Sequence, residues 1–243
     1  MADLYLFAKA GFIVIASGYR YQGTTLKRDQ WGGVEVDDIV NLVPALKSLD
    51  YVDPERLHML GLSRGGTMTY LAIKRGVPVK AAAVIGAVTD VKAWVDARPG
   101  MGIVNGNEFI DGFANIWPDY EHRAEEYYRS RSASTGPIRS TCLFSSSIAG
   151  PNRMVPVTQA LRMAEALQEN GKVYALRIYE RDGHPLPRNR DDRDRMIVDW
   201  FTELAKAATS QGSILQRRKL FTHACDTHVS SFGRVRAHQE LYG

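Results

Sequence analysis

The chain has 243 residues, of which 44% are hydrophobic and 24% are charged, and its formal net charge is +4. These values are ordinary for a soluble globular protein, and the length suits one α/β domain with a substantial core. No apolar run reaches the roughly 18 residues of a membrane span, and the start carries no secretory signal. The two cysteines form no disulfide framework, so we expect a cytoplasmic protein with no membrane partner.

Most of the positive charge lies near the carboxyl terminus. Residues 209–243 hold five basic and two acidic residues, a net charge of +3 out of the total +4, so residues 1–208 are nearly neutral. A basic end without an aromatic binding platform is more typical of a solvated tail than of a nucleic-acid-binding arm. We therefore predict one domain over residues 1–208, a basic tail that packs poorly against it, and no nucleic-acid partner.

Strand and helix patterns alternate along residues 1–208. Strands are expected at 12–16, 57–60, 81–86 and 173–179, and helices at 36–46, 64–75, 157–167 and 191–204. This order predicts an α/β fold with a mostly parallel sheet, helices on both faces and ligands at the carboxyl ends of the strands. An aromatic and charged stretch at about 91–131 predicts an insertion over the sheet edge, a natural place for a substrate lid.

The segment from Gly61 to Gly65 reads Gly-Leu-Ser-Arg-Gly between an apolar run and a helical stripe. Strand, sharp turn and helix are the context in which Gly-x-Ser-x-Gly is a nucleophile elbow, with the serine hydroxyl exposed above the sheet. The helix that follows directs its free N–H groups toward the same point. Ser63 is therefore the candidate nucleophile; the alternative is a glycine-rich turn with an incidental serine.

A serine nucleophile needs a base, and His184 directly follows the strand expected at 173–179. His58 lies within a strand and is more typical of a structural residue. The other histidines lie in the insertion or the tail: His122, His223, His228 and His238. No metal-ligand spacing is present, and the glycines at 100–106 follow no strand, so we expect neither a metal nor a cofactor.

Three segments together resemble the catalytic domain of prolyl oligopeptidase-like serine hydrolases: 11–20 (GFIVIASGYR), 32–76 (GGVEVDD through AIKRG) and 155–186 (VPVTQAL through RDGHPL). The resemblance implies an α/β-hydrolase fold and hydrolysis of a peptide or ester bond through an acyl-enzyme. It implies Ser63 as nucleophile, His184 as base and the backbone N–H of Arg64 as one oxyanion donor.

The chain departs from the family pattern at the position of the catalytic acid. The family has His-Gly-x-x-Asp-x-x-Val-Pro, and alignment on Val155 and Pro156 puts Asn152 in place of that aspartate. The strand before it should be apolar, but it reads CLFSSSIA. Because likeness resumes at Val155, we hypothesise a local reading-frame slip over 142–153. Asp182 and Glu180 are nearby carboxylates, but both lie on the wrong side of the loop for the usual geometry.

The second departure concerns the start of the chain. The resemblance begins at what the family would make the helix before its fourth strand. The third strand, which in the family lies between the strands expected here at 12–16 and 57–60, is not found, and neither is its oxyanion loop. We therefore expect a gap in the sheet and a truncated member of the family. Two functions follow: an active serine hydrolase, or a non-catalytic relative that at most binds ligand in the cleft. The oligomeric state stays open.

Overall fold

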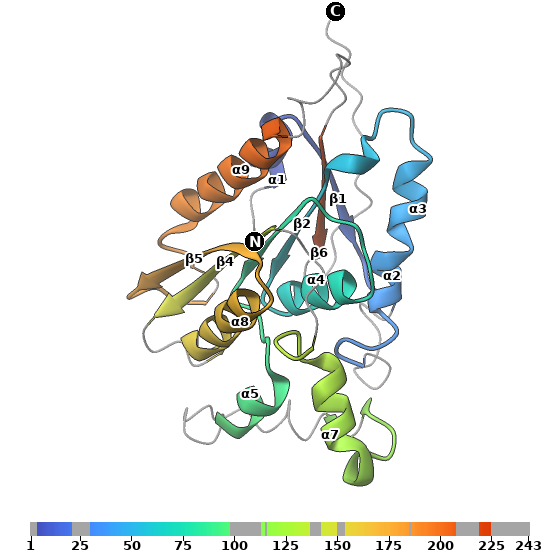
Figure 1. The fold of residues 1–243 in the computed structure, drawn as a ribbon, viewed down its shortest axis with the longest axis vertical. Coiled ribbons are helices and arrows are strands. Elements are labelled where there is room, and N and C mark those ends of the chain that lie inside the picture. Colours follow the sequence, from blue (N-terminus) through green and yellow to red (C-terminus); the bar gives the residue numbers. More distant parts are fainter. Residues whose placement is uncertain are drawn as a thin grey trace, which may run out of the picture.

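The computed structural model describes residues 4–20, 30–97, 113–114, 116–136, 142–149, 154–184, 186–207 and 219–224 (Figure 1). These residues form a six-stranded sheet in the order β1-β6-β2-β3-β4-β5, in which each pair of neighbours is parallel. The strands are β1 (Phe12–Ser17), β2 (Leu57–Leu62), β3 (Ala81–Ile85), β4 (Cys142–Ala149), β5 (Val173–Glu180) and β6 (Lys219–Ala224). The helices are α1 (Leu4–Lys9), α2 (Val36–Val40), α3 (Leu42–Lys47), α4 (Arg64–Lys74), α5 (Val91–Ala97), α7 (Tyr120–Arg131), α8 (Val157–Glu169) and α9 (Arg190–Ala207), with a 3-10 turn at Pro54–Arg56. Asn152 lies outside the described residues.

Helices cover both faces of the sheet, as the alternating pattern predicts. Every residue of β2 is buried, and its side chains alternate between the two faces of the sheet. Met59 belongs to the core beneath α2, α4 and α8, whereas Leu60 belongs to the core beneath α1 and α9. Strands buried on both faces explain why the sequence of β2 and β3 is continuously apolar.

The single helix expected over residues 36–46 is instead two helices, α2 and α3, which meet at Asn41. Pro44 is the physical reason. Its ring nitrogen carries no hydrogen, so it cannot donate to the carbonyl of Val40, and its ring would clash with that carbonyl. The proline is tolerated because it lies in the first turn of α3. The apolar stripe predicted the helical face correctly but not the break.

The structure corrects the expectation of a gap in the sheet. Residues 219–224 form β6, which lies between β1 and β2 and pairs with both, so part of the expected tail belongs to the sheet. Open edges of two buried strands would leave backbone N–H and C=O groups unpaired. Phe221 and Thr222 are residue types enriched in strands. β6 has only six residues, too few to give a sustained apolar periodicity in the sequence. The domain boundary at 208 stays a prediction.

The serine-rich stretch before Asn152 also forms a strand. β4 pairs with β3 on one side and with β5 on the other. Backbone hydrogen bonding on both edges is therefore retained, although the apolar pattern typical of a central strand is missing. None of the helices in the described part of the chain is long and apolar enough to cross a membrane.

The described parts of the stretch at 91–131 pack as an aromatic cluster. The rings of Trp31 and Trp94 are stacked at 5.5 Å, and those of Phe113 and Trp117 are stacked at 4.1 Å. The cluster includes Val88, which lies in the connection between β3 and α5, so the stretch is attached to the sheet near the carboxyl end of β3. Figure 1 shows α5 and α7 together below α4. That this insertion acts as a lid stays a prediction.

Candidate active site

Ser63 lies at a sharp turn between β2 and α4. Its backbone angles are φ 53° and ψ −121°, a conformation that a non-glycine residue adopts only under strain. The turn is held by hydrogen bonds from Ser63 N to Ile85 O (2.7 Å) and from Gly66 N to Ser63 O (3.0 Å). A Cβ at Gly61 would lie 2.2 Å from the carbonyl oxygen of Gly65, so this position admits only glycine. The local structure is the elbow that the motif predicts.

The residue after the serine is anchored by a buried carboxylate. Arg64 begins α4, and its guanidinium forms an ion pair with Glu35 at 3.5 Å. Glu35 is fully buried and also accepts a hydrogen bond from Gly32 N at 2.6 Å. The guanidinium carbon of Arg64 lies 5.3 Å from the ring centre of Tyr19. The start of α4, where backbone N–H groups have no intrahelical acceptor, is thereby fixed in place. Glu35 lies far from Ser63 in the sequence, and no local motif indicates its role.

His184 lies in the loop between β5 and α9 and packs against the carboxyl end of β3. A Cβ at Gly86, which directly follows β3, would lie 2.9 Å from Cε1 and 3.0 Å from Nδ1 of His184. Since Ser63 donates its backbone N–H to Ile85, both residues contact the end of the same strand. The Ser63 and His184 side chains are not hydrogen-bonded to each other. Catalytic hydrogen bonds are often loose until substrate binds.

The imidazole of His184 is mostly removed from water. Burial lowers its pKa from 6.5 to about 4. Its Nδ1 atom is buried and has no hydrogen-bond partner among the described residues. In a serine triad this nitrogen donates to the acid. Asn152, which the sequence puts at the acid's position, lies outside the described residues.

Asp182 shapes the loop that carries His184. Its carboxylate accepts hydrogen bonds from the backbone N–H groups of Gly183 (2.7 Å), Arg188 (3.2 Å) and Asn189 (3.0 Å) and from Asn189 Nδ2 (2.8 Å). Burial alone would raise the pKa of Asp182, but these hydrogen bonds outweigh it and lower the pKa. Asp182 makes no hydrogen bond to His184. Its carboxylate is instead used to hold the loop closed.

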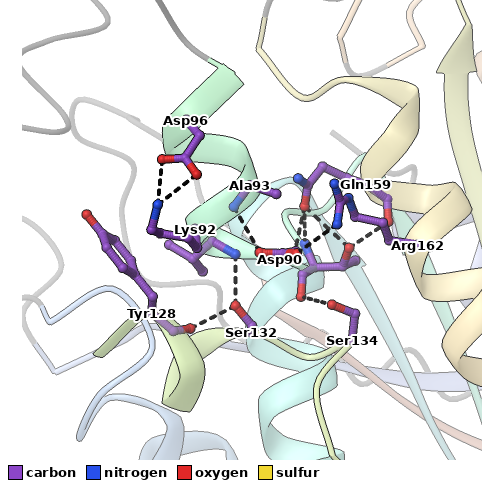
Figure 2. Close-up of polar contacts among 11 residues, drawn as sticks. Asp90, Lys92, Ala93, Asp96, Tyr128, Ser132, Ser134, Gln159 and Arg162 are labelled. Carbon is purple, nitrogen blue, oxygen red and sulfur yellow. Dashed lines mark hydrogen bonds and ion pairs between the residues drawn. The ribbon is translucent and has the colours of Figure 1, made fainter. Parts of the chain in front are cut away.

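The loop that follows β3, residues 86–90, is fastened from three sides. Gln159 of α8 accepts from the backbone N–H groups of Thr89 and Asp90, both at 2.8 Å. Ser134 donates to the carbonyl of Thr89 at 3.0 Å, and Thr67 of α4 donates to the carbonyl of Val88 at 2.8 Å. In Figure 2 the side chains of Gln159 and Arg162 reach toward Asp90. This network fixes the chain just beyond Gly86, against which His184 packs.

The model of the prolyl oligopeptidase family matches residues 1–208 of this chain. The chain belongs to the prolyl oligopeptidase family. It is 24% identical over 214 residues to the uncharacterized peptidase YuxL of Bacillus subtilis (strain 168), covering 83% of this chain and 31% of that protein. The acylamino-acid-releasing enzyme of Arabidopsis thaliana is 22% identical over 192 residues, covering 72% of this chain and 23% of the enzyme.

Several solved peptidase structures have the same fold. A puromycin-hydrolyzing peptidase of Mycobacterium tuberculosis superposes with a TM-score of 0.58 and 25% identity, covering 80% of this chain and 28% of that one. An acylaminoacyl peptidase of Pyrococcus horikoshii gives a TM-score of 0.58 at 20% identity, with 72% and 28% covered. The α/β-hydrolase fold is therefore confirmed. The chain spans less than a third of the length of these relatives.

We expect Gln159→Met to destabilise the fold. Methionine has a similar size but no acceptor for the buried N–H groups of Thr89 and Asp90, and each unpaired group costs about 1–3 kcal/mol. The free energy of unfolding in urea should fall by roughly 2–4 kcal/mol. Gln168→Met is the matched control because Gln168 is exposed on the same helix. Equal stability of the two variants would show that the Gln159 hydrogen bonds contribute nothing.

Proposed function

We propose that this chain is a serine hydrolase that cleaves a peptide or ester bond through an acyl-enzyme. Ser63 is the nucleophile, His184 the base, the backbone N–H of Arg64 an oxyanion donor, and Asn152 occupies the position of the acid. One observation carries the proposal: a serine in a strained elbow and a partly buried histidine contact the end of the same strand, β3. Membership of the family and the peptidase names of its relatives support the same chemistry.

A single nitrogen of His184 accepts the proton that moves during the reaction. Nε2 of His184 takes the proton of Ser63 as the Oγ atom attacks the substrate carbonyl. The negative oxygen that forms faces the start of α4, where the N–H of Arg64 donates to it. The protonated imidazole then gives its proton to the leaving group, and water releases the acyl group by the same steps. Burial keeps His184 neutral at pH 7, which is the state a base requires.

A second candidate is binding without turnover, and one observation favours it. The proton on Nδ1 of His184 has no acceptor among the described residues, and asparagine brings no charge to stabilise the imidazolium. Both candidates predict a ligand at the carboxyl ends of β2 and β3. They differ in whether a covalent bond to Ser63 forms.

The test is a rapid-mixing experiment with p-nitrophenyl acetate. An acyl-enzyme predicts a burst of nitrophenolate of up to one equivalent per chain, followed by slower turnover. Ser63→Ala should remove the burst, and Ser48→Ala, which changes a serine remote from the elbow, should retain it. A folded chain that shows neither a burst nor any nitrophenolate release above that of Ser63→Ala would reject the hydrolase and leave ligand binding.

The rate of acylation should depend on pH through His184. The neutral imidazole is the active form, and burial lowers its pKa to about 4. Acylation should therefore stay constant down to about pH 5 and halve near pH 4, rather than near the unperturbed 6.5. The burst rate measured between pH 3.5 and 8, with circular dichroism to confirm folding at each pH, tests this. A midpoint near 6.5 in the folded chain would contradict the buried position of His184.

A further inference from the structure

Strand β6 joins two parts of the sheet that have no other strand pairing between them. Its residues align with β1 from Phe12 opposite Lys219 to Ser17 opposite Ala224, and with β2 from Leu57 opposite Leu220 to Gly61 opposite Ala224. Within the described part of the chain, β6 is the only strand that pairs with β1. Figure 1 shows β6 between β1 and β2.

Within the described part of the chain, the elements that contact β6 most extensively are β1, β2, α4 and the turn at Pro54–Arg56. These four elements lie in the first third of the sequence. The strand therefore fits into a slot formed by segments that lie far from it along the chain. Without β6, the facing edges of β1 and β2 would each expose a row of backbone donors and acceptors. Helices would still cover both faces of the sheet on either side of these edges. Such edges bind an extended segment readily, because backbone hydrogen bonds need no particular side chains.

We propose that the slot between β1 and β2 is an acceptor site for an extended polypeptide in the parallel direction. Its occupant is the segment 219–224, and the site accepts this segment equally from a separate molecule. The ligand class is thus a short peptide that adds a central strand, recognised through two backbone ladders at once. This inference concerns the sheet and does not depend on the proposed hydrolase activity.

The first experiment uses the full chain with Phe221→Pro. Proline lacks the N–H that a central strand must donate, so β6 can no longer pair on both edges. The melting temperature should fall, and a synthetic peptide of residues 217–226 should restore it, in proportion to the logarithm of peptide concentration. The same peptide carrying the proline should have no effect. Val229→Pro, which places the same residue type beyond the strand, is the control substitution.

The stability of Phe221→Pro, with and without the peptide, shows whether the slot is an acceptor site. Unchanged stability of Phe221→Pro would show that 219–224 does not occupy the slot. A destabilised variant that the peptide does not restore would overturn an acceptor site open to a separate molecule. If the variant aggregates, hydrogen exchange on the unmodified chain replaces it. The amides of 13–16 and 220–223 should be protected and lose protection together, whereas rapid exchange at 220–223 in the folded chain would overturn the proposal.

Discussion

Replacing Gly86 by alanine is expected to slow acylation of Ser63 by about 100-fold. The free energy of unfolding should fall only by the backbone strain of alanine at this position, on the order of 1 kcal/mol. The new Cβ would lie 2.9 Å from Cε1 and 3.0 Å from Nδ1 of His184. Contacts this short force one group to move, and the imidazole moves more easily than a buried strand end. The base then leaves its position beside the elbow while the sheet is retained. The rate of reaction with a fluorophosphonate measures the effect.

Gly171→Ala is the matched control for Gly86→Ala. The two glycines have nearly the same backbone conformation, φ +62° at Gly171 and φ +59° at Gly86, but Gly171 has no atom within 4 Å of the added Cβ. Each substitution therefore costs a similar strain, on the order of 1 kcal/mol. Only Gly86→Ala should lose reactivity. Equal reaction rates for the two variants would show that the contact between His184 and Gly86 has no part in the site.

Asn152→Asp is expected to give the largest gain in turnover, up to about 10⁴-fold, the factor by which the reverse change impairs a comparable triad. A carboxylate beside Nδ1 of His184 would accept its proton and stabilise the imidazolium. It would also raise the pKa of His184 from its value of about 4, so the acidic limb of the rate profile should move to higher pH. Ester hydrolysis between pH 3.5 and 8 records both effects.

Gln168→Glu adds the same charge on the exposed side of α8 and is the control for Asn152→Asp. It should change neither the rate nor the midpoint. A gain in rate with an unmoved midpoint would mean that the new carboxylate does not interact with His184. No gain at all would mean that residue 152 does not stand in the acid's place, and the alignment on Val155 and Pro156 would then be wrong there.

Much of the fold could be predicted from local patterns. The buried strands β1, β2 and β3 are short apolar runs, and α8 ends at Asn170 and Gly171 as its stop signal predicts. The errors have specific causes. A proline inside an otherwise helical stripe separates α2 from α3. β6 cannot be predicted from local patterns, because a strand forms there to pair the open edges of β1 and β2, which lie far away in the sequence.

The candidate site likewise has some features that the local sequence predicts and others that it does not. The elbow at Ser63 could be predicted because its glycines and its strand-to-helix context are contiguous in the sequence. The sequence Asp182-Gly183-His184 is a signal for a tight turn, but it does not show that the carboxylate of Asp182 closes the loop. The contact of His184 with Gly86 and the anchoring of Arg64 by Glu35 join residues from different elements. Such contacts follow only from the assembled sheet.

Labelling with a fluorophosphonate tests the central claim, that Ser63 is a nucleophile activated by His184. The folded chain should take up one label per molecule, located on Ser63 by mass spectrometry of the digested protein. Ser63→Ala and His184→Ala should each abolish it, as should unfolding in urea. A folded chain that remains unlabelled at Ser63, or one labelled at the same rate after His184→Ala, would contradict the account.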